Sequence, residues 1–168
     1  MSALGAFGNN DPYIQSDGAS TVNLGYFASK KTKIEVDFRF MDPSTKQQRV
    51  FGVDQGPFVC VLYINGSGSL AWGLQDDVGN WQPMIAADTA RHTFTLDGPN
   101  STIRLAGSDG TVQWEGTVGT TRTKTACAPI TVFGGTTTNG TGAATLTNPG
   151  SVCIYGMKIW NGATLVRD

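Results

Sequence analysis

The C-terminal stretch, residues 151–168, is the feature that most constrains the fold of this chain. A run of β-branched, aromatic and apolar residues reaches Asn161-Gly162, and a second short apolar run follows that pair. Asn-Gly is a strong hairpin signal because both central positions of a type I′ turn need a positive φ, which Asn tolerates and Gly adopts freely. The stretch therefore predicts a β-hairpin with its turn at Asn161-Gly162, and such a hairpin needs a sheet to close.

Successive residues of a β-strand point in opposite directions, so the first strand of this hairpin has two faces. One face is apolar throughout and is expected to meet a core, and it consists of Cys153, Tyr155, Met157 and Ile159. The other face is mixed and consists of Val152, Ile154, Gly156, Lys158 and Trp160.

Residues 32–41 alternate most regularly of all. One face is apolar, with Ile34, Val36, Phe38 and Phe40. The other face is charged, with Lys33, Glu35, Asp37 and Arg39. One apolar and one charged face are typical of an antiparallel sheet that is covered by a core on one side and by water on the other.

The remaining chain divides into short apolar segments separated by turn residues. With 22 glycines in 168 residues and only 15% charged residues, the composition favours short strands and turns over helices. The expected strands are residues 13–15, 22–26, 49–53, 58–65, 69–75, 81–85, 91–96, 102–106, 111–116 and 129–133, and residues 134–150 are expected to form a long polar loop. Turns every 8 to 12 residues or so are typical of an antiparallel sandwich or jelly roll, an all-β fold with little or no helix.

The length of 168 residues predicts one domain, residues 13–168, preceded by an arm or linker at residues 1–12. A formal net charge of −1 at pH 7 argues against nucleic acid or an anionic membrane as the partner. No apolar run approaches the roughly 20 residues of a membrane span, and the N-terminal residues lack the pattern of a signal peptide. Cys60, Cys127 and Cys153 fit no metal-binding spacing, and two interpretations stay open: free buried thiols, or a disulfide between two of the three.

The two ends of the chain resemble a known family. The opening motif YIQSDG at residues 13–18, with NLGY at 23–26 and the alternating strand after it, resembles the beginning of bacterial LamG-like jelly-roll domains. The closing motif IYGMKIW at residues 154–160, with LVRD at 165–168, resembles their end. These domains belong to the concanavalin A-like lectin and glucanase superfamily.

The resemblance implies two curved antiparallel sheets packed face to face, with the closing strand paired to the N-terminal YIQSDG segment. It places ligands on the concave face or on the loops at one rim. Such domains are commonly parts of secreted or cell-surface proteins and often bind glycans. An extracellular or cell-surface location, in a larger multidomain chain or a homo-oligomer, is therefore expected.

Catalysis has to be considered because laminarinase-like relatives carry Glu-x-Asp-x-Glu, or the bulged form Glu-x-Asp-x-x-Glu, on one strand. A retaining glycosidase needs two carboxyl groups about 5 to 5.5 Å apart on the same face. Here Glu35 and Asp37 are followed by Arg39 and Phe40, so the second glutamate is missing. The lone His92 has no evident nucleophile partner and is expected to be packed. The chain is therefore interpreted as a non-enzyme.

Tryptophans beside short polar residues are the better indication of binding, because a sugar ring stacks on an aromatic face while amides and carboxylates bond its hydroxyls. The candidate ligand contacts are Trp72, Trp81, Trp114, Gln75, Asn80 and Gln82. Trp72 shares its strand face with Leu70 and Leu74, which favours a core position for it.

No cofactor is required by the sequence, and calcium is the ion to consider because related laminin-type and lectin domains bind it. Ca²⁺ takes about six to eight oxygen ligands. Asp76, Asp77 and Asn80 form the one local cluster of suitable side chains, and a solvated turn explains the same residues.

Three functional hypotheses follow. The first is a non-catalytic carbohydrate-binding or adhesion module of an exported or surface protein. The alternative is a structural or protein-interaction jelly-roll domain, such as a phage, fibre or surface-layer component. A glycoside hydrolase is the least favoured of the three.

Overall fold

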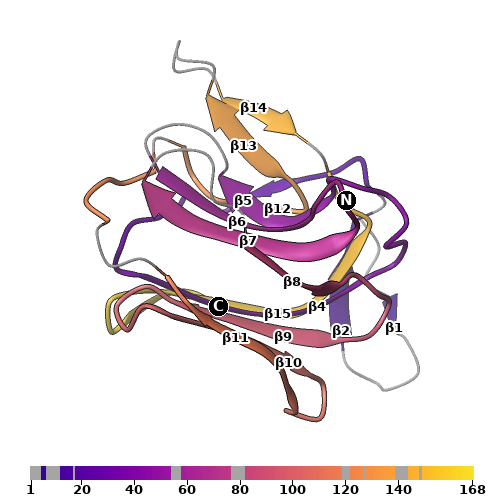
Figure 1. The fold of residues 1–168 in the computed structure, drawn as a ribbon. Helices are drawn as coiled ribbons and strands as arrows, with labels where there is room; N and C mark the ends of the chain where they lie inside the picture. The colour runs from indigo at the N-terminus through magenta and orange to yellow at the C-terminus, as the bar shows by residue number, and fades with distance from the viewer. Residues whose placement is uncertain are drawn as a thin grey trace.

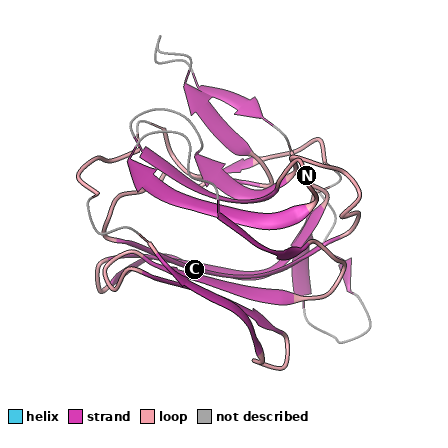
Figure 2. Ribbon diagram, in the orientation of Figure 1, coloured by secondary structure: helices cyan, strands magenta, loops and turns pink. Residues whose placement is uncertain are grey.

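The structure of this chain is a computed structural model that describes residues 5–6, 12–16, 18–53, 58–76, 82–118, 122–126, 128–138, 144–147 and 149–168. These residues form strands and turns, with no helix among them (Figure 2). The predicted all-β fold is confirmed. Within the described residues no helix is long and apolar enough to cross a membrane.

The first sheet has the strand order β1-β2-β15-β4-β9-β10-β11, and β16 pairs with β15. Its strands are β1 (Gly5–Ala6), β2 (Pro12–Gln15), β4 (Thr32–Phe40), β9 (His92–Asp97), β10 (Thr102–Gly107), β11 (Val112–Thr117), β15 (Val152–Asn161) and β16 (Thr164–Arg167). The closing strand β15 pairs with β2 through Cys153–Gln15 and Ile154–Ile14. The expected pairing of the two ends of the chain is therefore confirmed.

The second sheet has the order β14-β13-β5-β6-β7-β8, and β12 pairs with both β5 and β3. Its strands are β3 (Val22–Asn23), β5 (Arg49–Val53), β6 (Phe58–Ile64), β7 (Ser69–Asp76), β8 (Gln82–Ala86), β12 (Thr131–Val132), β13 (Gly135–Thr138) and β14 (Ala144–Thr147). Pairing in both sheets is antiparallel except between β13 and β5, which are parallel at Thr136–Val53.

The two sheets lie one above the other as the layers of a sandwich (Figure 1). Apolar side chains from both inner faces form one buried cluster, and Phe51 of β5 meets Phe94 of β9 across it with ring centroids 6.2 Å apart. On β4 the alternation is as predicted, because Ile34, Val36 and Phe38 are fully buried in this cluster. In Figure 1 the middle of β7 bows toward the first sheet, so the outer face of the second sheet is concave.

The predicted faces of β15 are wrong for its first half. The register against β4 passes from Ile154–Phe38 directly to Gly156–Asp37, so Tyr155 is the extra residue of a β-bulge. Such an insertion reverses the face of every residue that precedes it. Val152 and Ile154 consequently join Ile159 in the core, and Tyr155 lies on the outer face with its ring stacked under Arg91.

The C-terminal hairpin is present, but its turn is shifted by one residue from the prediction. Asn161 pairs with Thr164, so the central residues of the turn are Gly162 and Ala163. Gly162 has a φ of +62°, whereas Asn161 and Ala163 do not have positive φ values. A positive φ at the first central position alone is typical of a type II′ turn, in which glycine is favoured.

The polar stretch predicted as a single loop, residues 134–150, contains a further pair of strands. β13 and β14 pair with each other from Gly135–Thr147 to Thr138–Ala144. The prediction relied on the lack of large apolar residues, but threonine is a good strand residue and needs no buried face to pair.

Two of the three cysteines are free and buried, Cys60 on β6 and Cys153 on β15, which confirms the free-thiol interpretation for them. Cys127 lies outside the described residues. Burial raises the pKa of the Cys60 thiol to about 12 from an ordinary value of 9.0.

We expect this thiol to make the fold sensitive to alkali. The unfolded chain loses the thiol proton above a pH of about 9 while the folded chain keeps it, so the free energy of unfolding falls by up to roughly 1.4 kcal/mol per pH unit from there toward pH 12. Urea denaturation over this range measures the slope, and Cys60→Ala should reduce it. If the free energy of unfolding falls as steeply with pH in Cys60→Ala as in the unsubstituted chain, the assignment of this pH dependence to Cys60 is contradicted.

Candidate functional site

Trp72 and Trp114 pack against each other where the two sheets meet at one side of the sandwich. Trp72 of β7 is 4% exposed and belongs to the core, and Trp114 of β11 is half-buried. Their ring centroids are 6.1 Å apart with an interplanar angle of 58°. A Cβ on Gly116 would overlap the Trp114 indole, so glycine at 116 leaves room for that ring. This arrangement favours the core alternative for Trp72 and leaves Trp114 as the more accessible ring.

The other predicted contacts are only partly described. Gln82 is exposed at the start of β8, directly opposite Trp72. Gln75 and Asp76 belong to β7, but their side chains lie outside the described residues, as do Asp77, Asn80 and Trp81 entirely. Within the described residues no group of three or more His, Cys, Asp and Glu side chains could hold a metal ion. The glycan-binding hairpin and the calcium cluster therefore remain predictions.

The acidic pair on β4 lies on the outer face of the first sheet. Asp37 forms an ion pair with Arg91, with Nε–Oδ1 and Nη2–Oδ2 distances of 2.8 and 2.5 Å. The Arg91 guanidinium also lies 3.9 Å from the centre of the Tyr155 ring. Asp37 is thus tied to a cation that is itself stacked on an aromatic ring, and Glu35 beside it is exposed.

His92 is buried, as expected for a packed histidine. Its Nδ1 lies 2.8 Å from Oε1 of Gln113, and its Nε2 lies 2.8 Å from Oδ1 of Asp88. Its ring also packs against Phe38, with centroids 5.9 Å apart. Because both ring nitrogens are engaged, the residue joins β9 to the neighbouring β8–β9 connection and to β11.

A small cavity lies on the concave outer face of the second sheet. Its volume is about 190 Å³, and it is lined by Gln47, Arg49, Val61 and Tyr63. The outward residues of β6 are Val59, Val61 and Tyr63, which form a second apolar cluster with Ala71. We call the space bounded by Gln47, Arg49, Val61 and Tyr63 the concave-face cavity.

Arg49 is held in the concave-face cavity by close contact with glycines. A Cβ on Gly135 would lie 2.6 Å from the Arg49 Cδ, and one on Gly52 would lie 3.7 Å from the same atom. The absence of a side chain at Gly135 leaves room for the arginine stem, whereas a Cβ on Gly52 would clash with Val61 and make only ordinary contact with Arg49. Arg49 is 8% exposed. Its guanidinium carbon is 5.9 Å from the centre of the Tyr63 ring, and Nη1 donates to the Gln47 carbonyl at 3.4 Å.

The loop before β5 fixes the rim of the cavity. The buried Gln48 donates through Nε2 to the Thr45 carbonyl at 2.9 Å, and its Oε1 accepts from the Ser151 amide at 3.0 Å. At the start of the loop, hydrogen bonds from Ser44 lower the pKa of Asp42. Gln47, between these anchors, has a φ of +67°, a left-handed conformation that is uncommon for a residue other than glycine. Strained residues of this kind are concentrated at functional sites.

Sequence patterns did not single out the concave-face cavity. β6 is apolar on both faces, so alternation could not separate its outward residues from its core residues. The one available signal was Tyr63, an aromatic residue with a polar group in a strand of aliphatic residues.

Comparison with solved structures defines the fold. A native heptameric SAP-like pentraxin from Limulus polyphemus superposes with a TM-score of 0.52 at 10% sequence identity, over 94% of this chain and 74% of the pentraxin. The fold is a concanavalin A-like jelly-roll sandwich. This agrees with the superfamily that the terminal motifs resemble.

Two further similar structures have lower scores. A glycosyl hydrolase family 16 protein from Mycobacterium smegmatis gives a TM-score of 0.47 at 14% identity, over 90% of this chain and 76% of the hydrolase. A β-1,3-glucanase from Mycobacterium marinum gives 0.47 at 12% identity, over 90% and 75%. Neither a family model nor a curated protein matches the chain.

The left-handed backbone at Gln47 leads to a prediction about stability. Gln47→Gly should be more stable than Gln47→Ala by about 0.5 to 1 kcal/mol, because glycine adopts this φ without the Cβ clash and this gain exceeds its extra freedom in the unfolded chain. The measurement is urea denaturation of both variants. Lys46→Gly and Lys46→Ala are the control pair, since Lys46 has an ordinary φ and glycine should be the less stable residue there. If the glycine variant is the more stable one at both positions, or the less stable one at both, the strain proposed at Gln47 is contradicted.

Proposed function

We propose that this chain is a non-catalytic carbohydrate-binding or adhesion module of an exported or surface protein, and that a sugar residue binds in the concave-face cavity. The single observation that supports this best is the grouping of an aromatic ring, a guanidinium and an amide around one small space on a curved sheet. Tyr63 is 6% exposed and Arg49 8% exposed, so both are held rigidly by their surroundings.

The chemistry of these groups suits a pyranose ring. The part of Tyr63 that lines the cavity offers apolar contact to sugar C–H groups, while Arg49 and the Gln47 side chain offer hydrogen-bond donors and an acceptor to hydroxyls. A volume of about 190 Å³ accommodates a single sugar residue, with neighbouring residues of a chain lying along the concave face. A site of this size favours recognition of one unit over enclosure of a long polymer.

The lining of the concave-face cavity supports the non-catalytic part of the proposal. A retaining hydrolase needs two carboxyl groups about 5 to 5.5 Å apart. The described residues that line the cavity, Gln47, Arg49, Val61 and Tyr63, carry no carboxyl group. Glu35 and Asp37 lie on the other sheet, and Asp37 is paired with Arg91.

The proposal is tested by a glycan array that includes β-glucans and mucin sugars, read with and without Ca²⁺, followed by calorimetry on the saccharides that bind. Tyr63→Ala should weaken binding about tenfold, since an aromatic contact of this kind contributes about 0.5 to 1.5 kcal/mol beyond its buried area. Tyr63→Phe keeps the ring, so it should retain most of the affinity.

Tyr155→Ala is the matched control, because Tyr155 lies on the outer face of the other sheet and should not contribute. Thermal unfolding of each variant separates loss of binding from loss of fold. Absence of binding by the native chain to every saccharide would remove the proposal. Binding that survives Tyr63→Ala and is lost in Trp114→Ala would move the site to the predicted tryptophan hairpins.

A further inference from the structure

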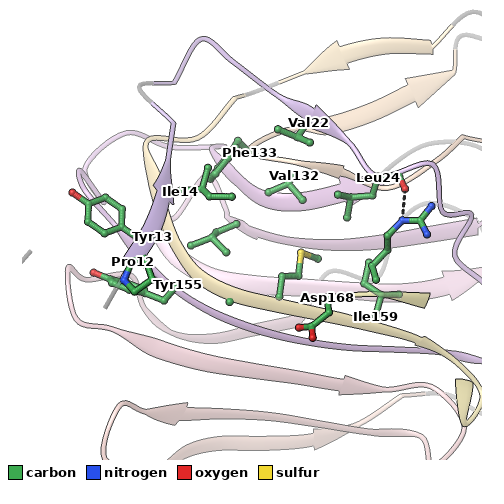
Figure 3. Close-up of a pocket in the computed structure, with 14 residues that line it drawn as sticks. Pro12, Tyr13, Ile14, Val22, Leu24, Val132, Phe133, Tyr155, Ile159 and Asp168 are labelled. Atoms are coloured by element: carbon green, nitrogen blue, oxygen red, sulfur yellow. Dashed lines mark hydrogen bonds between the residues drawn. The ribbon is translucent and has the colours of Figure 1, made fainter. Parts of the chain in front are cut away.

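A larger apolar cavity opens at the side of the sandwich opposite the Trp72–Trp114 pair. Its volume is about 390 Å³, and it lies between β2, β15 and β16 of the first sheet and β3 and β12 of the second (Figure 3). Its walls are mainly apolar and include Leu24, Val132, Phe133, Ile154, Met157 and Ile159. We call this space the edge cavity.

The edge of β15 is open along the same cavity. β2 pairs with β15 at Cys153 and Ile154, and β16 pairs with it from Ile159 onward. Between these two ladders no strand among the described residues pairs with residues 155–158 on this side, whereas β4 continues on the other side. The gap is four residues long, or about 13 Å at the usual rise of a strand.

No described strand pairs with the backbone groups in this gap. Alternate N–H and C=O groups of a strand edge point outward, and an unpaired edge is a template for another strand. Gly156 has no side chain to cover this edge, and no described atom lies within 4 Å of the position its Cβ would take. β2 and β16 are both antiparallel to β15, so a segment between them would continue an existing ladder.

The apolar interior of the edge cavity lies beside the gap at residues 155–158 of β15. Residues directly opposite one another in an antiparallel pair point to the same face. Met157 packs against the core and lines the cavity, so a residue opposite it would direct its side chain inward toward Val132 and Phe133. Arg167 closes one end of the space, since its Nε donates to the Leu24 carbonyl at 2.9 Å across the two sheets (Figure 3).

We propose that the edge cavity is an acceptor site for an extended peptide segment of another chain, which pairs antiparallel to β15 between β2 and β16 and buries an apolar side chain beside Val132 and Phe133. Ile14 and Val22, which are 54% and 48% exposed, form the mouth of the site. A small apolar molecule could fill the interior but could not pair with the backbone of residues 155–158, whereas a peptide strand could do both. This proposal does not depend on glycan binding.

The test uses the ¹⁵N-labelled full chain and a synthetic peptide, acetyl-Thr-Val-Thr-Val-Thr-Lys-amide. A peptide of the same composition with its two valines adjacent is the control. Each peptide is added free and is also attached after Asp168 through a long Gly-Ser linker, which raises its effective concentration to about the millimolar range. Hydrogen exchange of the amides of residues 155–158 is the readout, and the alternating peptide should slow the outward-facing amides about tenfold or more.

Two substitutions of valine by tryptophan test whether the slowed hydrogen exchange depends on the edge cavity. Val22→Trp should abolish the protection by filling the mouth of the edge cavity. Val112→Trp, at a valine of similar exposure, 46%, on β11, should leave it unchanged. Thermal unfolding of both variants checks that the fold is retained.

Four results would overturn the proposal. The first is an absence of protection in the attached form of the alternating peptide. The second is equal protection by the control peptide. The third is saturation of the cavity by decanoate, seen as shifts of the Met157 methyl group, with no response to either peptide. A dimer of the native chain that already protects residues 155–158 would likewise replace the peptide with a second copy of this chain.

Discussion

The contact between the inner faces of the two sheets is the constraint on which the rest of the structure depends. Each sheet has an apolar face that is stable only when the other covers it, and Phe51 and Phe94 meet at this contact. Because side chains alternate along each strand, the residues left for recognition are those on the outer faces and at the open sides. The core thus determines which surfaces of the sandwich a ligand can reach.

The two outer faces differ in chemistry. On the first sheet charged residues form ion pairs with one another, as Asp37 does with Arg91. The Arg91 guanidinium also stacks on the Tyr155 ring. On the second sheet the outer face is concave and mostly aliphatic, and Arg49 and Tyr63 stand out in it. The left-handed Gln47 and the close approach of Gly135 to Arg49 show that the backbone is specially shaped at this place. This asymmetry is the basis for locating sugar binding there.

Local patterns predicted those parts of the fold that depend on alternation. The faces of β4 were predicted correctly, because a half-buried strand shows its period directly in the sequence. The pairing of the two ends of the chain was also correct, but it was implied by the family resemblance and not by alternation. The bulge at Tyr155 was not predictable, because it depends on the register with β4 and no residue of β15 signals it. The concave-face cavity was missed for a related reason: Gln47 and Arg49 meet Val61 only after two separate segments, the start of β5 and β6, have paired.

The most direct test of the account is a methyl NMR titration with a saccharide that binds the chain. If the sugar occupies the concave-face cavity, the methyl resonances of Val61 shift in a saturable way. The methyl resonances of Val36, which lies in the core on β4 of the first sheet, do not shift. Saturable shifts of the Trp114 indole N–H with none at Val61 would contradict the account and place recognition at the Trp72–Trp114 pair.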